Sequence, residues 1–442
     1  MKKYLYVIIF GYTLGISAQN TGIPEIDNLI NMPEIPGMPR DMYSHQQNPN
    51  PALEIEAEIR RQQQQIINEA LRRRYASEIE RQKAERANAI NELLEHGFPS
   101  WSLQDSVGTS FFHQAFEEIS QMLAGENELN LARAVFLIEN AACGNTLNYA
   151  DYQNFIKHKA DLCRQKIKEN RWNPNNNIIK NMMLFRLLTD TLKFKNAKME
   201  QSGIHLPIRY NYDDFNSKKY KNSHFVTRLM QSGEGQCYSM PLYYLILAEA
   251  INAEASWVFS PHHSFIKIED EQGAWCNLEL TCGAILSDVH YINSGYIKAE
   301  AIRNKLFLEP MNKSQTVAEL LLNLARYYHS AYGPDDFYLQ CIHTAEPYLL
   351  NNLNALILKS IYEEKLTSQL AYLLDAKTPE NLKEKSPAAC QHYEQMHALY
   401  QQIDQLGYEE VPDALYATWL NYMAQQKEKA GNSQPLWLNK MK

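Results

Sequence analysis

The chain has 442 residues, of which 45% are hydrophobic and 11% aromatic, so it can bury a sizeable core and has room for two or three structural units. Its formal net charge is −8, and its Lys and Arg residues are spread along the sequence rather than gathered into one basic segment. Proteins that bind nucleic acid usually carry a basic patch, so nucleic acid is not an expected partner.

The N-terminus has the pattern of a signal peptide over residues 1–18. Lys2 and Lys3 precede an apolar run over 4–16, and the small residues around Ala18 provide a cleavage point. The apolar run is short for a transmembrane helix, although an uncleaved anchor is the alternative interpretation. We therefore expect an exported protein, periplasmic or extracellular, that meets the membrane only through the signal peptide before cleavage.

Two different segments follow the leader. Residues 19–51 are rich in Pro, Asn, Gln and Met without a sustained period, which predicts a disordered tether. Residues 52–96 are highly charged and contain no Gly or Pro, which predicts one long helix. Its apolar stripe is thin, with Ile55, Ile59 and Ile66 the largest members, and this favours a solvated helix packed along one edge over a short coiled coil. Such a helix would suit a protein partner.

The rest of the chain predicts an α+β protein with far more helix than strand. Helical spacing of apolar residues recurs through 97–200, for example over 149–169 and 177–195. A region with β character follows over 201–292. Its short β-like runs lie at 205–210, 254–259, 263–268 and 274–280. Helical spacing returns over 293–430, with a turn-rich segment between two helices, as in helical-hairpin repeats.

Seven cysteines are an odd number, which leaves at least one thiol outside any intramolecular disulfide in an oxidising compartment. Cys237 as the free, working thiol would fit this count, and it would fit equally if the six structural thiols were all free. The sequence itself gives no pairing.

Cys237 has the most distinctive surroundings of the seven cysteines. Gly233 and Gly235 before it permit a tight turn, and 238–250 is an apolar run that predicts a helix. A thiol at a helix N-terminus faces partial positive charge that favours the thiolate, and the same N–H groups can hold an oxyanion. Gln236 could add a donor to that oxyanion site. A buried structural cysteine is the alternative interpretation.

Two neighbouring histidines stand before the run 264–268. Adjacent side chains in a strand point to opposite faces, so only one of them can readily meet Cys237. We take His263 as the catalytic base and His262 as the alternative base. A pair of surface or core imidazoles without a catalytic role is the competing interpretation.

Glu279 lies 16 residues after His263, at the end of the next alternating run. A hairpin of that length would place its carboxylate beside the start of the histidine strand. The carboxylate could then accept a hydrogen bond from the imidazole and hold the ring in its working tautomer. Asn277, on the same strand face, is a competing orienting residue, and a solvated surface glutamate is the remaining alternative.

The order of these segments resembles the transglutaminase-like superfamily, a papain-type fold with a Cys-His-Asp triad. Gly-Gln-Cys237 is similar to its nucleophile motif, and His263-Ser-Phe-Ile is similar to its histidine strand. The segment Trp275-Cys-Asn-Leu-Glu279-Leu-Thr is similar to the one that carries its acid, although that family usually has aspartate and proline where Glu and Leu stand here. The resemblance covers about 200–290 firmly and 290–375 loosely.

Further motifs resemble one bacterial branch of this family, in which tetratricopeptide-like helices follow the core. These motifs are Tyr-Asn-Tyr-Asp-Asp-Phe at 210–215 and Ser-Met-Pro at 239–241. The resemblance implies a small core in which the cysteine helix packs on an antiparallel sheet, flanked by helical regions. It also implies the roles of nucleophile for Cys237, general base for His263 and orienting acid for Glu279.

The expected function is therefore acyl transfer at a peptide or amide bond of a protein or peptide, through a thioester on Cys237. Water would make the enzyme a hydrolase, and an amine would make it a transamidase. The alternative is a catalytically inactive fold that serves as an interaction or scaffold protein. Neither a cofactor nor a metal is expected, because the spacing of His262 and His263 with Cys276 and Cys282 matches no zinc pattern and no phosphate-loop signature is present.

Overall fold

The computed structural model describes most of the chain, and its class is α+β with helix dominant. Helix accounts for 66% and strand for 10%, with small antiparallel sheets, which confirms the expected class although no specific fold is identified. The described residues are 51–100, 105–195, 201–214, 217, 222–294, 297–410, 414–415, 417–418, 420–422 and 425. The predicted signal peptide over 1–18 and the predicted tether up to residue 50 lie outside them. No helix among the described residues is long and apolar enough to cross a membrane.

The long charged helix α1 (Pro51–His96) belongs mostly to a unit of its own, residues 14–92. Ion pairs one turn apart run along it, as between Arg81 and both Glu78 and Glu85 at 2.5 and 2.6 Å. These solvent-exposed pairs each contribute little to stability. Its large apolar residues from Ile55 to Ile79 stay exposed, among them Ile59 and Ile66, whereas Leu93 near its end is buried.

The described residues from Leu93 onward form the second compact unit. The predicted divisions near residues 200 and 292 fall inside this unit and stay predictions. Its first helices begin at polar N-caps, whose side chains accept hydrogen bonds from the first free N–H groups. These helices are α2 (Ser106–Ala124), α3 (Leu131–Ala142), α4 (Tyr149–Glu169) and α5 (Asn177–Thr189), and their caps are Asp105, Asn130, Asn148 and Asn176.

The helix expected over 177–195 is shorter than predicted. It ends at Thr189, and the chain continues as strand β1 (Leu192–Lys195), which pairs antiparallel with β2 (Gln201–His205). The reason is visible in β1, where buried Leu192 and Phe194 alternate with exposed lysines in the two-residue period of a strand.

The main sheet has four antiparallel strands in the order β5-β6-β7-β8. They are β5 (Ser256–Ser260), β6 (His263–Glu269), β7 (Trp275–Glu279) and β8 (Ala284–Leu286). The runs expected over 254–280 correspond to the first three, whereas β8 was not predicted. Helix α7 (Ser239–Ala250) packs on β5 and β6 and is buried through residue 248, as expected for a helix apolar on every side.

Short elements connect the hairpin β1–β2 to α7. They are β3 (Arg209–Tyr210), the 3-10 turn η3 (Tyr212–Asp214), α6 (Val226–Ser232) and β4 (Glu234–Gly235). Strands β3 and β4 pair in parallel, with Tyr210 opposite Gly235. Strand β4 of this pair ends shortly before α7 begins.

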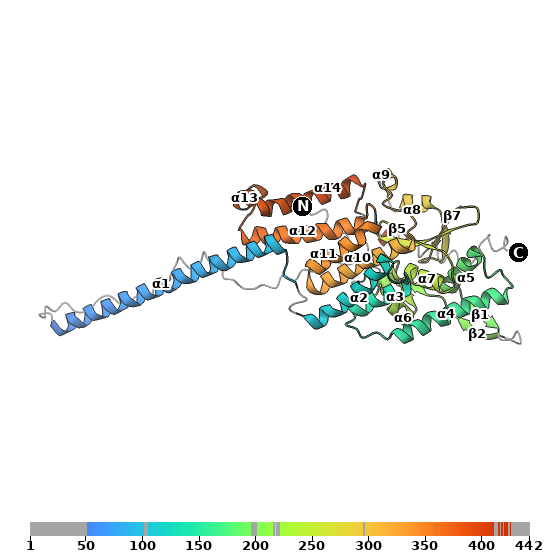
Figure 1. Ribbon diagram of the computed structural model, residues 1–442, viewed down its shortest axis with the longest axis horizontal. Helices are drawn as coiled ribbons and strands as arrows, with labels where there is room; N and C mark the ends of the chain where they lie inside the picture. Colours follow the sequence, from blue (N-terminus) through green and yellow to red (C-terminus); the bar gives the residue numbers. More distant parts are fainter. Residues whose placement is uncertain are drawn as a thin grey trace. The chain divides into compact units, whose positions relative to one another are not determined.

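Helices fill the C-terminal part of the unit, as predicted (Figure 1). They are α8 (Asp288–Ser294), α9 (Ala299–Arg303), α10 (Lys313–Tyr332), α11 (Asp336–Ala345), the 3-10 turn η4 (Glu346–Tyr348), α12 (Leu353–Leu373), α13 (Pro379–Lys385) and α14 (Pro387–Gln405). Helix α10 packs against α2, α3 and α11, and α12 packs against α14.

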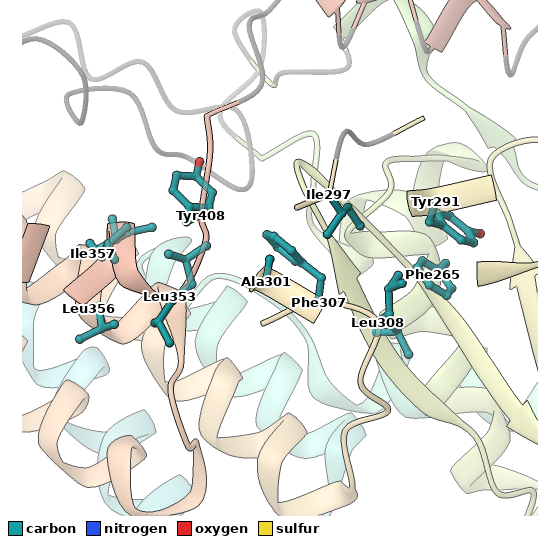
Figure 2. Close-up of a cluster of buried hydrophobic side chains, with 13 residues drawn as sticks. Phe265, Tyr291, Ile297, Ala301, Phe307, Leu308, Leu353, Leu356, Ile357 and Tyr408 are labelled. Carbon is teal, nitrogen blue, oxygen red and sulfur yellow. The ribbon is translucent and has the colours of Figure 1, made fainter. Parts of the chain in front are cut away.

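One hydrophobic cluster joins the main sheet to the C-terminal helices (Figure 2). Phe265 on β6 and Tyr291 on α8 belong to it, and so do Phe307, Leu353 and Tyr408 from later segments. Each buried aliphatic or aromatic side chain of this kind contributes about 1.5–3 kcal/mol relative to exposure. The sheet and the helices that follow it therefore share one core.

Candidate active site

Cys237 lies at the junction between β4 and α7. Gly233 ends α6 with φ +71°, the left-handed conformation that glycine adopts without strain. A Cβ at Gly235 would lie 2.5 Å from Leu229 Cδ1 and 2.7 Å from Met240 Cγ, so this position excludes a side chain. The two glycines thus set the chain so that Cys237 comes immediately before the first turn of α7, where only 4% of its surface is exposed.

His263 begins strand β6, directly after the tight turn that joins β5 to β6. His262 lies in that turn with φ +54°. Ser260, the last residue of β5, pairs with His263, the first residue of β6. A proline followed by a residue with positive φ suits a type II turn. The side chain of His263 is 1% exposed, so its imidazole lies inside the protein.

Glu279 ends β7 and reaches the imidazole diagonally across the sheet. Leu278 pairs with Ile266, which sets Glu279 two positions from direct opposition to His263. His263 Nε2 donates to Glu279 Oε2 at 2.7 Å. Because an ionised carboxylate can only accept, this bond assigns the proton of the ring to Nε2.

The carboxylate of Glu279 accepts three further hydrogen bonds. The backbone N–H and the hydroxyl of Thr281 donate to Oε1 at 2.9 and 2.6 Å, and the hydroxyl of Tyr291 donates to Oε2 at 2.9 Å. Four donors on one fully buried carboxylate satisfy both oxygens and stabilise the negative charge.

The pair of His263 and Glu279 is held in its charged form. Burial lowers the pKa of His263, but the charge of Glu279 and hydrogen bonds to Cys237 and Glu279 outweigh it, so the pKa rises to about 10. Burial also raises the pKa of Glu279, but His263 and the Thr281 donors outweigh it and the pKa falls below its usual value. The imidazole is therefore protonated at neutral pH.

The thiol of Cys237 is among the groups that raise the pKa of this imidazole, which places the thiol close to the ring. Since Nε2 is bonded to Glu279, we infer that the thiol faces Nδ1. The sulfur also lies 3.9 Å from the carbonyl oxygen of His262, a weak S–H contact.

Ser264 ties the histidine strand to the cysteine. Its hydroxyl donates to the carbonyl of Cys237 at 2.6 Å and accepts from Trp257 Nε1 at 2.9 Å. All three side chains are buried. The backbone of Cys237 and the start of β6 are therefore fixed relative to each other.

The alternative residues lie in other surroundings. His262 is in the turn and presents its carbonyl to the thiol, whereas the carboxylate of Glu279 is bonded to His263. Asn277 donates to Asp288 Oδ1 at 2.8 Å and so faces the start of α8. The amide of Gln236 donates to the carbonyl of Asp214, so one of its hydrogens holds the η3 turn. The oxyanion role of Gln236 stays a prediction.

Tyr291 is a site residue that the sequence did not reveal. It lies on α8, stacks on Phe265 with ring centroids 3.9 Å apart, and is buried (Figure 2). Helix α8 is anchored to the sheet where Lys267 pairs with Asp288 at 3.0 Å. No local pattern pointed to Tyr291, because its partner Glu279 lies on a different element. Thr281 did belong to the quoted motif, so a signal for it existed.

Among the described residues, no group of three His, Cys, Asp or Glu side chains is arranged to hold a metal ion. All seven cysteines lie in described segments, and no disulfide joins any two of them.

Comparisons of the chain with known proteins found no match to a family model, a curated protein or a solved structure. A functional interpretation therefore depends on the chemistry of the site.

Proposed function

We propose that this protein is an exported, thiol-dependent acyl-transfer enzyme with a transglutaminase-like core. One observation carries the proposal: a buried imidazole is bonded to Glu279, and the thiol of Cys237, which stands before a helix, is among the groups that raise the pKa of this imidazole. Cys237 is then the nucleophile, His263 the proton carrier and Glu279 the orienting acid. This is the arrangement that thiol acyl transfer requires.

The reaction begins with Cys237 as thiolate and His263 as imidazolium. The sulfur attacks the carbonyl carbon of a peptide or amide, and the carbonyl oxygen becomes an oxyanion. His263 then gives its proton to the leaving amine as the carbon–nitrogen bond breaks, which leaves a thioester on Cys237. A water molecule or a second amine attacks the thioester carbonyl, and His263 accepts the proton of the attacking group. The carbon–sulfur bond then breaks, the acid or the new amide is released, and Cys237 returns to the thiolate.

The N-terminus of α7 supplies the electrostatic part of this mechanism. Its first N–H groups and its dipole favour negative charge at the sulfur and at the oxyanion. The N–H of Gln236 is bonded to Ser239 Oγ at 3.0 Å, so other donors of the turn serve the oxyanion. No cofactor takes part in these steps, and the substrate is a protein or a peptide.

A second candidate function is that of an inactive scaffold that keeps this core for interaction. The burial of the site favours it, since Cys237 is 4% and His263 1% exposed. A thiol that no substrate reaches would serve only to pack α7 against β6.

Labelling with an iodoacetamide probe at pH 7 separates the two functions. Peptide-resolved mass spectrometry follows the rate at each of the seven cysteines in the wild type, His263→Gln and His262→Gln. We expect Cys237 to react fastest, His263→Gln to slow it by about tenfold or more, and the matched His262→Gln control to leave it unchanged. Cys237 labelling that is no faster than at the other cysteines and independent of His263 would establish the scaffold function.

Product analysis of wild type and Cys237→Ala with a casein digest gives the reaction type. Hydrolysis yields new peptide termini or carboxylates, whereas transamidation incorporates an added primary amine such as a dansylated cadaverine. Neither product should form with Cys237→Ala, because the thioester cannot form without the thiol.

A further inference from the structure

A cavity of about 460 Å³ lies outside the candidate active site, in the size range of small-molecule sites. The elements that line it are α4, α5, α6, α7 and the segment from the end of β2 to β3, which can be followed in Figure 1. Its lining divides into two parts, an apolar floor and a basic rim.

The floor is made of buried apolar side chains. Leu188, Leu229 and Tyr243 contribute to it, and each is at most 2% exposed to solvent. Leu229 and Tyr243 come from α6 and α7, the two helices on either side of Cys237. An occupant that inserts here must be apolar.

The rim carries three basic side chains from separate elements. Lys159 from α4, His205 from β2 and Arg209 from β3 all line the cavity. Lys159 Nζ lies 3.3 Å from His205 Nδ1, and His205 Nε2 donates to the carbonyl of Leu187 at 2.7 Å. This bond assigns the ring proton to Nε2 and leaves Nδ1 as an acceptor for the lysine.

Lys159 is a half-buried cation without an acidic partner in the part of the chain that the structure describes. Burial alone lowers its pKa, and no nearby carboxylate raises it. The ammonium of Lys159 contacts a neutral imidazole and lies 5.1 Å from the centre of the Phe155 ring, so no carboxylate among the described residues neutralises its charge, and an anion at the rim would do so.

Three backbone N–H groups around the cavity already have partners within the protein. Ile208 N donates to Leu188 O at 3.0 Å, Arg209 N to Gly233 O at 2.9 Å, and Gly233 N to Leu229 O at 2.8 Å. A peptide occupant would need backbone partners for its own amides, and these groups cannot provide them. A hydrocarbon chain makes no such demand.

We propose that this cavity binds a single-chain anionic amphiphile, a fatty-acid carboxylate whose tail occupies the apolar floor and whose head meets Lys159, which His205 positions, and Arg209, which also pairs with Glu234 at 3.5 Å. The proposal goes beyond the acyl-transfer function and does not depend on it. The site lies apart from Cys237, although its floor belongs to the helices that flank the cysteine.

Isothermal titration of the purified chain with dodecanoate tests the proposal. We expect saturable binding of one molecule with a Kd on the order of 10–100 μM, and far weaker binding of dodecyltrimethylammonium. Lys159→Met keeps the apolar stem and removes the charge, so it should weaken binding by about tenfold. Arg209→Gln, at an exposed position, should weaken it in the same direction.

Lys157→Met is the matched control, since Lys157 is exposed on the same helix and does not line the cavity. It should leave the affinity for dodecanoate unchanged. The proposal is overturned if the wild type shows no saturable binding, or if Lys159→Met and Lys157→Met bind equally. It is also overturned if a tripeptide with a leucine carboxyl terminus displaces dodecanoate and binds with a lower Kd than dodecanoate does.

Discussion

Removing the hydroxyl of Tyr291 tests whether Glu279 is held as an ionised, fully bonded carboxylate. The substitution Tyr291→Phe deletes one of the four donors on Glu279 and leaves the stacking on Phe265 in place. The phenyl ring has the same shape, so the change is confined to the hydrogen bond at 2.9 Å.

The expected loss follows from the charge of the acceptor. A hydrogen bond to a charged group contributes about 1.5–3 kcal/mol, against about 0.5–1.5 kcal/mol for a neutral pair. The free energy of unfolding should therefore fall by about 1.5–3 kcal/mol at pH 7. By linkage, the pKa of Glu279 should rise.

The pH dependence has a definite sign. The folded-state pKa of Glu279 is lowered, so its contribution to stability is present above its unfolded pKa of 4.5 and is lost as pH falls through the lower folded value. The difference between wild type and Tyr291→Phe should consequently shrink below pH 4.5. Urea unfolding followed by tryptophan fluorescence, at steps from pH 7 down to pH 3, measures this difference.

Tyr338→Phe provides the matched control. Its hydroxyl is also buried, but it donates to the neutral carbonyl of Leu358 at 2.7 Å. It should cost about 0.5–1.5 kcal/mol without this pH dependence. If Tyr291→Phe costs no more than Tyr338→Phe, and the same at every pH, then Tyr291 does not stabilise a charged Glu279 and the reasoning fails.

Three further outcomes follow from buried groups. The pKa of His263 is raised to about 10, so the stability difference between wild type and His263→Gln should be full below pH 6.5 and vanish as pH rises to 10; urea unfolding that shows a constant difference contradicts this. Burial raises the pKa of Glu139 to about 7, so the free energy of unfolding of the wild type should fall by about 3 kcal/mol between pH 4.5 and 7. Glu139→Gln should remove this pH dependence, and a variant that keeps it would contradict the reasoning. Phe307→Ala in the shared core should lower the free energy of unfolding by about 3–5 kcal/mol. The sheet and the C-terminal helices should then melt together at a lower temperature, and separate calorimetric transitions would count against one core.

The sequence predicted those parts of the site that depend on neighbouring residues. The glycines before Cys237 and the apolar run after it are local signals, and they placed the thiol at a helix start. The two-residue period likewise placed His263 and Glu279 on paired strands, where the structure brings them within hydrogen-bonding distance. The roles of these residues in catalysis stay predictions.

Long-range packing explains what the sequence did not predict. Tyr291 reaches Glu279 only because α8 folds back over β6, and Gln236 turns toward Asp214 because η3 packs beside it. The strand β1 was expected as helix, since its two buried residues, Leu192 and Phe194, are too few to establish a period.

The hydroxyl of Ser264 has a mechanical consequence. Ser264 follows His263 directly, and its bond ends on the carbonyl of Cys237 itself. If β6 moved along α7 and drew the imidazole of His263 away from the sulfur of Cys237, the hydrogen bond of Ser264 would be stretched first. This hydrogen bond joins the residue after His263 to the backbone of Cys237, so it restrains the distance between the sulfur and the imidazole. Small motions elsewhere in the sheet need not change that distance.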